Sequence, residues 1–565
     1  MYHSIHAVRS PTTGSPGRVS IVTRHSRGSR GTVQVASTSP TPSARETCDV
    51  VVIGSGIAGL SAAALLATYG EKVIVCESHA VIGGACHSFR RGEGYHFESG
   101  PSLYSGLNAR GPQGNPLGLV LQAVGAKLDV LTYDVWNIYI PESGHTKFPA
   151  KVGPTGFDKL FEVCGDDETK REWDRLLAET KPLTKAATAV PPLAIRLDGG
   201  VLRSTVLRYL GPIVSSLPVL GRLTKPYSDV MDRAGLRPGG FLRNYIDLLS
   251  FLLSGLDSKG TITAEVAFML QEWVSDTAAL EFPKGGSQAL ADALAGAVTR
   301  QGEENEVYVN EHVVEILVEE GRAVGVRTKK GKEIRARRGV VSNATTIQTS
   351  QLLPDGVPAK KSWVEQLKDT PVNPSFMHLH VGFDASGLHD LDLHHLVVND
   401  WSKGVAAEQN VVLISIASVA DPSLAPKGKH SLHAYYPATE PYDYWEELSR
   451  EEYESLKNER SQALWSAVEK VIPDIRRRAE VSMVGTPKTH EMYLRRYKGS
   501  YGAAYKAGME TFPFGGACPV PGLICAGDFT FPGIGLPAAA ASGAIAANSL
   551  VDLDRHTELL DRIGL

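Results

Sequence analysis

Short apolar runs alternate with amphipathic stretches along this chain, beginning near residue 50. Residues 50–53 form an apolar, β-branched run that predicts a buried parallel strand. A glycine-rich turn over 54–59 leads into a helical pattern that ends near Gly70. A second apolar run over 72–76 predicts another parallel strand, which ends at Glu77. The segment therefore predicts a strand, a glycine turn, a helix and a second strand.

This βαβ unit has the features of a dinucleotide-binding site. Gly54 permits the tight turn, Gly56 lets the backbone approach a pyrophosphate, and Gly59 lets the helix lie close to the strand. Free N–H groups at the helix start would face the phosphates, and Glu77 would accept hydrogen bonds from the adenosine ribose. A tight turn without a ligand is the alternative, and the agreement of strand, glycines and acid disfavours it. The predicted cofactor-binding set in this turn is completed by Ser55, Ile57 and Ala58.

A second glycine pair, Gly83 and Gly84, follows shortly after Glu77. Plain nicotinamide dehydrogenases have no need of a glycine pair at this point. The pattern is similar to that of the large FAD-binding group that includes amine oxidases, phytoene desaturases and carotenoid isomerases, in which this segment wraps the cofactor. The resemblance implies FAD rather than NAD, and it adds both glycines to the cofactor-binding set.

The pattern changes to helix from about residue 154, which predicts an interruption of the cofactor domain. Residues 193–256 form the most apolar long tract, and basic residues are interleaved with it. These are Arg196, Arg203, Arg208, Arg222 and Lys225. Such a surface could dip into an anionic lipid interface and give access to a lipid-dissolved substrate. An ordinary buried helical subdomain with outward arginines is the equal alternative, because the sequence does not reveal the geometry of the patch.

A β-meander over residues 307–344 is predicted to return the chain to the cofactor domain, after a helix over 288–300. In the flavoproteins that the chain resembles, the residue at Val313 pairs its backbone with the adenine. A second excursion follows over 346–480.

A strand over 376–383 in this second excursion places His378 and His380 on one face. Together with further histidines they could suggest a metal, but a metal site needs three or four converging ligands with supporting hydrogen bonds. A His-x-His strand near loop histidines is more typical of a structural role, so we predict no metal site. The further histidines are His389, His394 and His395.

The last part of the chain carries a second cofactor motif. Residues 522–528 predict a buried strand that ends in Asp528, followed by a Pro-Gly-Ile-Gly turn and a helix of small residues over 538–548. This places a carboxylate at the carboxyl end of a parallel strand, where ligands bind. Asp528 would accept a hydrogen bond from a ribityl hydroxyl. The amides of the turn, at Gly533, Ile534 and Gly535, would face the N1–C2=O side of an isoalloxazine.

With these motifs, the segments 283–286, 485–490 and 498–502 resemble the carotenoid isomerase family, within the phytoene-desaturase-like flavoproteins. The resemblance covers about residues 48–550 and implies FAD, a plastid location and a long polyene or terpenoid substrate. Family members often have glutamine where this chain has Ile534, which puts the reaction in doubt.

We expect cis-trans isomerisation of a carotenoid with the flavin unchanged overall. Desaturation, saturation or hydration of a carotenoid or terpenoid is the alternative, and so is a non-catalytic flavin- and carotenoid-binding protein. No catalytic residue is assigned.

These patterns predict an α/β fold, with an FAD-binding Rossmann-like domain of the two-dinucleotide-binding type and an interleaved α+β substrate domain. The FAD-binding domain is expected over 46–150, 281–345 and 481–552. The substrate-binding, membrane-facing domain is expected over 151–280 and 346–480.

Composition adds the compartment and excludes some partners. Of 565 residues, 42% are hydrophobic and the net charge is −4, which gives no support to nucleic-acid binding. The six cysteines form no CxxC pair, which favours a reducing compartment. Residues 1–45 are rich in arginine and hydroxyl side chains and contain no acid, which predicts a chloroplast transit peptide, with a disordered basic tail as the alternative. No apolar run long enough to cross a membrane occurs, so we expect peripheral membrane contact only.

Overall fold

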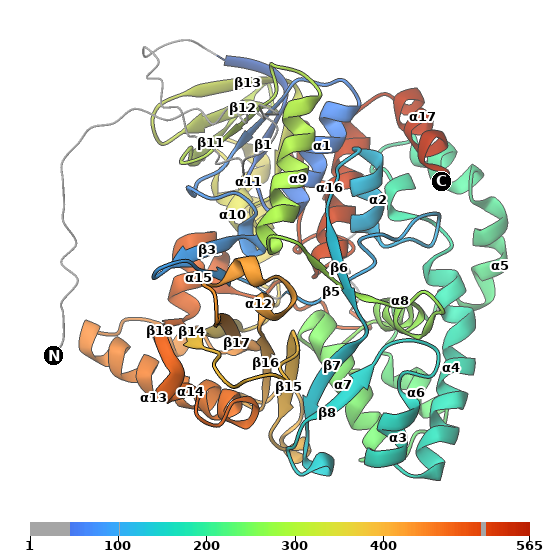
Figure 1. Ribbon diagram of the computed structural model, residues 1–565. Helices are drawn as coiled ribbons and strands as arrows, with labels where there is room; N and C mark the ends of the chain where they lie inside the picture. Colours follow the sequence, from blue (N-terminus) through green and yellow to red (C-terminus); the bar gives the residue numbers. More distant parts are fainter. Residues whose placement is uncertain (1–45, 101, 510–515) are drawn as a thin grey trace, which may run out of the picture.

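Two seven-stranded sheets, one above the other in Figure 1, form the framework of the protein. The computed structural model describes residues 46–100, 102–509 and 516–565. The predicted transit peptide, residues 1–45, lies outside these described residues.

The first sheet contains the predicted dinucleotide-binding strands. Its core is parallel: β1 pairs with β2 on one side and with β13 on the other, and β13 also pairs with β19. The antiparallel strands β11, β12 and β13 form the predicted meander. In spatial order the sheet runs β10 (Glu306–Tyr308), β2 (Val73–Cys76), β1 (Glu46–Ile53), β13 (Glu333–Ser342), β12 (Arg322–Thr328) and β11 (Val313–Glu319), with β19 (Leu523–Cys525) beside β13.

Helices cover both faces of the first sheet. On one face lie α1 (Ile57–Thr68), α2 (Pro116–Ala123), α9 (Ser287–Arg300) and α16 (Leu536–Leu550), with α17 (Leu553–Ile563) beyond them (Figure 1). Small residues let α1 approach its neighbours closely. A Cβ at Gly59 would lie 2.2 Å from the Gly54 carbonyl oxygen, and one at Gly543 would lie 2.3 Å from that of Ala58. On the other face lie α10 (Thr346–Gln351) and α11 (Pro358–Lys368).

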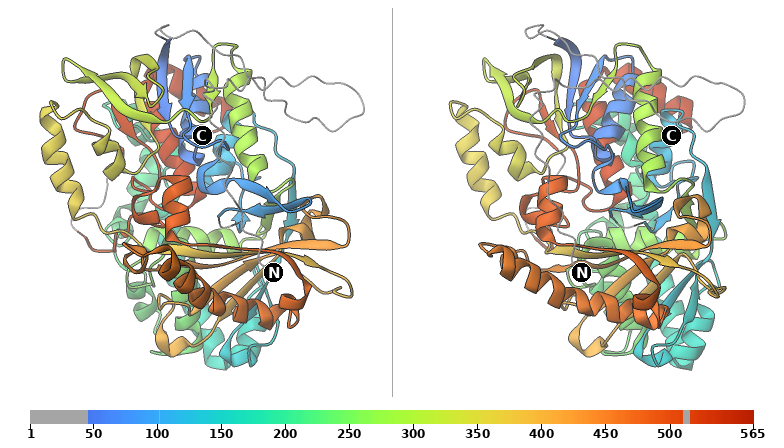
Figure 2. Two further views of the ribbon diagram at one scale, coloured as in Figure 1. Left: turned by 90° about the vertical axis from the view of Figure 1, so that its left-hand side faces the viewer. Right: turned by 60° about the vertical axis from the view of Figure 1, so that its left-hand side comes forward.

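The second sheet is buried on both faces. Alternate side chains along its long strands point to opposite faces, and each face is covered by other parts of the protein. On β14, Met377 and Leu379 pack against Leu464 of α13 (Arg450–Val471), which lies below the sheet in Figure 2. His378 and His380 point to the opposite face, as the alternation predicted. In spatial order the sheet runs β18 (Ala479–Gly485), β14 (Ser375–Asp384), β17 (Lys429–Glu440), β16 (Val411–Ser415), β15 (His394–Val398), β7 (Val135–Tyr139) and β8 (Phe148–Lys151).

The strands β7 and β8 differ from the sequence expectation. Apart from Lys151, the last residue of β8, they fall within the range 46–150, which we assigned to the FAD-binding domain, yet they belong to the second sheet. The physical reason is that β7 pairs in parallel with β15, a partner far along the chain that local patterning does not reveal. A small sheet of β5 (Tyr104–Ser105), β6 (Val130–Tyr133) and β9 (Leu280–Pro283) connects the two halves.

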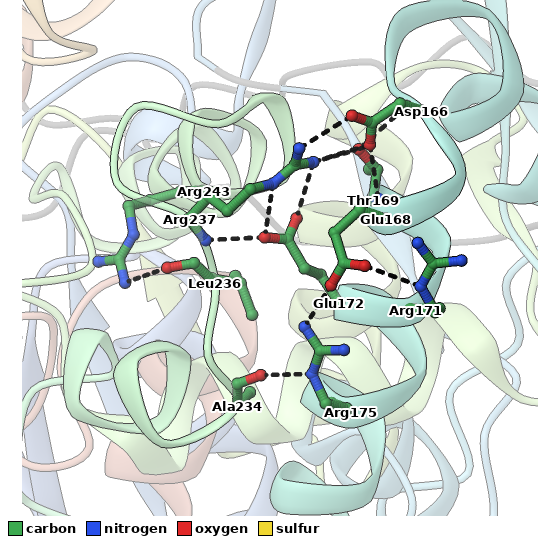
Figure 3. A network of polar contacts seen from close by, with 10 residues as sticks. All are labelled: Asp166, Glu168, Thr169, Arg171, Glu172, Arg175, Ala234, Leu236, Arg237 and Arg243. Carbon is green, nitrogen blue, oxygen red and sulfur yellow. Dashed lines mark hydrogen bonds and ion pairs between the residues drawn. The ribbon is translucent and has the colours of Figure 1, made fainter.

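A helical layer packs beside the second sheet. It comprises α3 (Asp158–Cys164), α4 (Asp167–Ala187), α6 (Ser228–Arg233), α7 (Phe241–Ser254) and α8 (Thr263–Val274). Figure 3 shows the polar network that ties α4 to the loop before α7. Arg237 donates to Asp166, the N-cap residue of α4, at 2.7 Å and to the buried Glu172 at 3.0 Å. Hydrogen bonds from Arg237 and Thr169 lower the pKa of Asp166 well below its ordinary value.

The apolar tract over 193–256 divides into two structurally different parts. Helix α7 is buried in the core, as the subdomain alternative expected. By contrast, α5 (Leu210–Leu220) and the π-helical turn before it, Leu202–Leu207, expose a row of large apolar side chains. We call this row the apolar patch, and its members, 36–60% exposed, are Leu202, Val206, Leu207, Leu210, Val214, Leu217 and Leu220.

The four arginines singled out in the tract, Arg196, Arg203, Arg208 and Arg222, are paired rather than free. Arg203 pairs with Asp554 and Arg208 with Asp561, both on α17, while Arg222 pairs with Glu179 on α4. Among the described residues, no helix combines the length and the apolarity needed to cross a bilayer.

Candidate functional site: a cofactor end and an apolar end

A cavity of about 880 Å³ is lined by residues from both sheets and from the helical layer. Its volume lies within the range typical of ligand and cofactor sites. The cofactor end is formed by the glycine turn after β1 and by the turn between β19 and α16. The apolar end is formed largely by Leu249, Leu253, Ile262, Phe268, Met269, Leu413 and Tyr435.

Most of the predicted cofactor residues meet at the cofactor end, although they come from four separate segments. Those that line the cavity are Gly54, Gly56, Ile57, Ala58, Glu77, Gly83, Gly84, Val313, Asp528, Ile534 and Gly535. Of the other three, Ser55 and Gly533 lie beside them in the same turns, and Gly59 lies in the first turn of α1.

The glycine turn after β1 and the pair Gly83 and Gly84 are in direct backbone contact. Gly54 adopts φ +88°, which favours glycine. A Cβ at Gly84 would lie 3.0 Å from the Cα of Gly56, and the Gly83 N–H donates to the Ser55 carbonyl at 3.0 Å. A Cβ at Gly56 would also lie 2.5 Å from the Asn343 side-chain oxygen. The backbone at these glycines therefore forms a shallow concave surface, which we call the backbone cradle, and side chains at these positions would fill it.

Glu77 ties the end of β2 to the glycine turn. Its Oε2 accepts from the Ser55 N–H at 2.8 Å and from the Ser55 hydroxyl at 2.6 Å. Its Oε1 accepts from the His79 N–H at 2.7 Å. The Ser78 hydroxyl is a fourth donor, to Oε1 at 3.2 Å, so the carboxylate's acceptor positions, about four, are all used. A ribose hydroxyl at the cavity wall would take the place of this longest bond.

At the other side of the cofactor end, Asp528 is held by Arg496. The Arg496 Nη2 donates to Asp528 Oδ2 at 2.5 Å, and the same guanidinium donates to the carbonyls of Ser500 and Tyr501. Sequence reasoning missed Arg496. Its position between the two family-like segments 485–490 and 498–502 was the available signal.

Two helix N-termini face the cavity without a capping side chain. The N-cap residues are Gly56 for α1 and Gly535 for α16, and neither helix has an acidic residue in its first turn. Their free N–H groups suit an anion or a developing negative charge. The backbone cradle, the acceptor at Glu77 and these two N-termini therefore fit FAD, with α1 at the pyrophosphate and α16 at the isoalloxazine.

Comparison with known proteins agrees with this geometry. The family described as flavin containing amine oxidoreductase matches residues 57–551. The chain belongs to this family. It is therefore a flavin-dependent enzyme with FAD as its cofactor, as the sequence predicted.

Relatives and solved structures extend the assignment. A chloroplastic prolycopene isomerase of Arabidopsis thaliana is 30% identical over 538 residues, which are 92% of this chain and 85% of the relative. An all-trans-retinol 13,14-reductase of Macaca fascicularis is 26% identical over 558 residues, covering 91% and 87%. The predicted resemblance to the carotenoid isomerases is thus confirmed.

The fold has matches among solved structures as well. An oxidoreductase from Methanosarcina mazei superposes with a TM-score of 0.57 at 18% identity, over 88% of this chain and 99% of that one. At this identity the likeness shows the fold alone, and together with the family match it confirms the predicted FAD-binding Rossmann-like α/β class with a substrate domain.

The apolar end contains two glutamates of α8 that sequence reasoning did not single out. Glu272 accepts hydrogen bonds from Ser105 at 2.8 Å and from Asn115 at 3.1 Å. The side chain of Glu265 has no hydrogen bond or ion pair with any other described residue, and burial raises its pKa to about 7. No motif marks Glu265, because its importance depends on which face of α8 meets the cavity.

The ligand atoms of His378, His380 and His433 lie within 4.8 Å of one another, close enough to hold a metal ion. In this structure, however, these imidazoles take part in hydrogen bonds: His378 joins a row with His433 and His490, and His380 Nε2 bonds to the Glu98 carbonyl at 2.9 Å. The His378 Nδ1 lies 2.7 Å from His433 Nε2, and its Nε2 hydrogen-bonds to His490 at the cavity wall. Two nitrogens bound to one zinc ion would be about 3.4 Å apart, from ordinary Zn–N lengths. Burial and the neighbouring imidazoles lower the pKa of His378, so the row is uncharged at neutral pH. His394 and His395 bond elsewhere, to Tyr133 and to the Asp392 carbonyl.

Proposed function

We propose that this protein isomerises cis double bonds in the conjugated polyene of a carotenoid, with the flavin unchanged overall. The observation that supports the proposal is the continuity of the cavity, because its cofactor end opens directly into an apolar end of the same cavity. A polyene has no polar group to anchor it, so an apolar channel that ends at the flavin site suits this class of substrate.

The roles of the chain's own residues follow from this arrangement. FAD, when bound, supplies reversible electron and hydride transfer. Leu249, Leu253 and Phe268 would exclude water and hold the polyene by its apolar surface. Phe376 and Tyr501, whose rings meet edge to face at 5.0 Å, would border the polyene next to the flavin. The N-terminus of α16 would stabilise negative charge on that side.

Saturation of a polyene is the second candidate function, and the retinol reductase relative favours it. The two functions differ in the mass of the product. Purified full-length protein with FAD, oxidised or reduced, would be incubated with prolycopene, and products would be separated by chromatography and weighed. An isomer of unchanged mass supports our proposal. A gain or loss of two hydrogens, or a gain of water, would replace it, and an unchanged polyene on a flavin-loaded protein would indicate a binding protein.

We further propose that the apolar patch is a bilayer-docking surface through which the polyene enters. The cavity wall includes Ala187, Val190 and Ile195, which directly precede the patch in the chain. Helix α5 lies at the outer edge of the molecule in Figure 1, and its exposed leucines would insert into the interface. Since the arginines are already paired with acids, apolar burial rather than charge would carry the attachment.

Docking can be tested by replacing exposed leucines of the patch and measuring binding of the variant to liposomes. Replacing Leu207 and Leu217, which are 60% and 59% exposed, by serine should reduce co-sedimentation with liposomes and turnover of liposome-borne substrate. Turnover in detergent should stay the same. Met492→Ser is the control, because Met492 is 69% exposed but lies outside the patch. Equal sedimentation of the double variant and the parent would contradict the docking proposal.

A plastid location is proposed on two grounds. The prolycopene isomerase relative is chloroplastic by name, and residues 1–45 have the composition of a transit peptide. Residues 1–45 fused to a fluorescent protein should direct it to chloroplasts, and diffuse fluorescence would contradict the proposal.

A further inference from the structure

Glu265 lies where the two ends of the cavity meet. It is in the first turn of α8 and lines the cavity, and its Oε1 would be 3.7 Å from a Cβ placed at Gly533. Gly533 belongs to the turn that leads into α16, the helix assigned to the isoalloxazine. The carboxyl group therefore stands between the flavin position and the apolar end.

No structural task accounts for this carboxyl group. A glutamate in the first turn often bonds back to the N-cap backbone, but the described contacts include no such bond here. The α8 start is satisfied by other groups, since Thr263 N–H donates to the Lys225 carbonyl at 2.9 Å and Ala264 N–H donates to that of Leu223 at 3.0 Å. Glu265 is only partly covered by protein atoms and lines the cavity, so its free carboxyl group is available to a bound molecule.

The other acids of the cavity contrast with Glu265. Glu77 accepts from Ser55 and His79, Glu272 accepts from Ser105 and Asn115, and Asp528 accepts from Arg496. Each of these acids has partners that fix its orientation. Among the described residues, Glu265 is the cavity acid whose proton is committed to no other group.

The groups that face Glu265 do not offset the effect of burial, so a substantial fraction of its carboxyl group is protonated near neutral pH. Tyr501 interacts electrostatically with Glu265 and also with Arg496 and Asp528. The last two form an ion pair, so their opposite charges largely cancel. His490 at the cavity wall is uncharged because burial lowers its pKa to about 3, and Glu272 lies two turns along α8. Desolvation is thus the cause that raises the pKa of Glu265 to about 7, although the helix N-terminus favours the ionised form.

We propose that Glu265 is the acid and base of the isomerisation, donating a proton to a polyene carbon and then removing it. The carboxyl O–H bond breaks as a C–H bond forms, which leaves a delocalised cation on the polyene and a carboxylate on Glu265. The former double bond now has single-bond character and rotates. The carboxylate then takes a proton from the same carbon, so the double bond re-forms and no net electron transfer occurs. This inference rests on the isomerase function proposed above.

The test compares Glu265→Gln, Glu265→Asp and the parent, all as full-length FAD-loaded proteins. Glutamine keeps the shape but cannot donate a carboxyl proton, so turnover of prolycopene should fall about 100-fold or more, the usual range for losing a general acid. Flavin content and prolycopene affinity should stay at parent values. Glu265→Asp should recover part of the turnover. The control is Glu162→Gln, a change to an exposed glutamate on α3, which should match the parent.

The pH profile and solvent isotope effect separate proton transfer from a structural role. Because the protonated form is active, parent turnover should fall as pH rises through about 7, whereas the residual turnover of Glu265→Gln should be flat. Deuterated water should slow the parent and leave Glu265→Gln unaffected.

Each failure has a different signature. Glu265→Gln with parent turnover, or with a parent-like pH profile, overturns this inference while the isomerase function stands. Loss of flavin in Glu265→Gln overturns it in favour of a cofactor-holding role. A parent that converts no cis carotenoid overturns the proposed function and this inference together.

Discussion

The two ends of the cavity recognise their ligands by different physical means. At the cofactor end, close backbone approaches and helix N-termini form the surface, and the acids Glu77 and Asp528 have fixed partners. At the apolar end, side-chain shape forms the surface and Glu265 has no partner. The cofactor end therefore depends on backbone geometry that requires glycine, whereas a polyene at the apolar end would be held by apolar volume that many side chains could provide.

The largest effect is expected from a side chain placed in the backbone cradle, because it should remove cofactor binding. Gly56→Val should abolish FAD binding, because even its Cβ would lie 2.5 Å from Asn343 Oδ1 and would fill the approach of the pyrophosphate. Flavin absorbance of the purified protein measures this. Gly211→Ala is the control, since a Cβ there meets nothing within 4 Å. A full flavin spectrum in Gly56→Val would refute the assignment of this turn.

Removing an acceptor at the same end should have a graded effect. Glu77→Ala should weaken FAD binding by about 1.5–3 kcal/mol, the cost of losing hydrogen bonds to a charged acceptor. The variant also frees Ser55, so the turn itself loosens. Titration of the apoprotein with FAD measures the dissociation constant. An unchanged constant would mean that another residue holds the ribose.

The helices behind the apolar end can be weakened without touching the cofactor end. Arg237→Ala leaves Glu172, which is 1% exposed, without its guanidinium partner and should lower the free energy of unfolding by about 1–3 kcal/mol. Arg171→Ala removes a partner of the more exposed Glu168 in the same network and should cost less than about 1 kcal/mol (Figure 3). Denaturant unfolding measures both. Equal losses would show that burial of Glu172 does not matter.

The smallest effect is expected from shortening one side chain at the apolar end, which should weaken binding of the polyene only slightly. Leu253→Ala should raise the KM for the polyene about fivefold, as expected from losing about 1 kcal/mol of apolar contact. FAD affinity should stay the same, because Leu253 lies in the helical layer rather than in the cofactor turns. Steady-state kinetics and flavin titration measure the two quantities. A matching change in FAD affinity would mean that the two ends are not independent.

The same difference between the two ends explains which features could be predicted from the sequence. The glycine turns, Glu77 and Asp528 could be predicted because backbone geometry restricts each position to few residue types. The assignment of β7 failed because its partner β15 is more than 250 residues away. Glu265 and Arg496 could not be placed at the site, since their roles depend on side-chain direction and on packing between segments that are distant in sequence.

The order of strands around β13 has a consequence for synthesis of the chain. The β13 strand pairs with β1, made almost 290 residues earlier, and with β19, made about 180 residues later. Besides β1, β13 already pairs with β12 near its start, at residues 333–335. In a nascent chain, therefore, only the last part of one edge of β13, residues 340–342, stays open until the last tenth of the polypeptide has left the ribosome. Contacts of such long sequence separation form slowly, and an unpaired edge favours aggregation. The flavin site is thus among the last features of this protein to form, and a chain that stops before residue 523 cannot complete it.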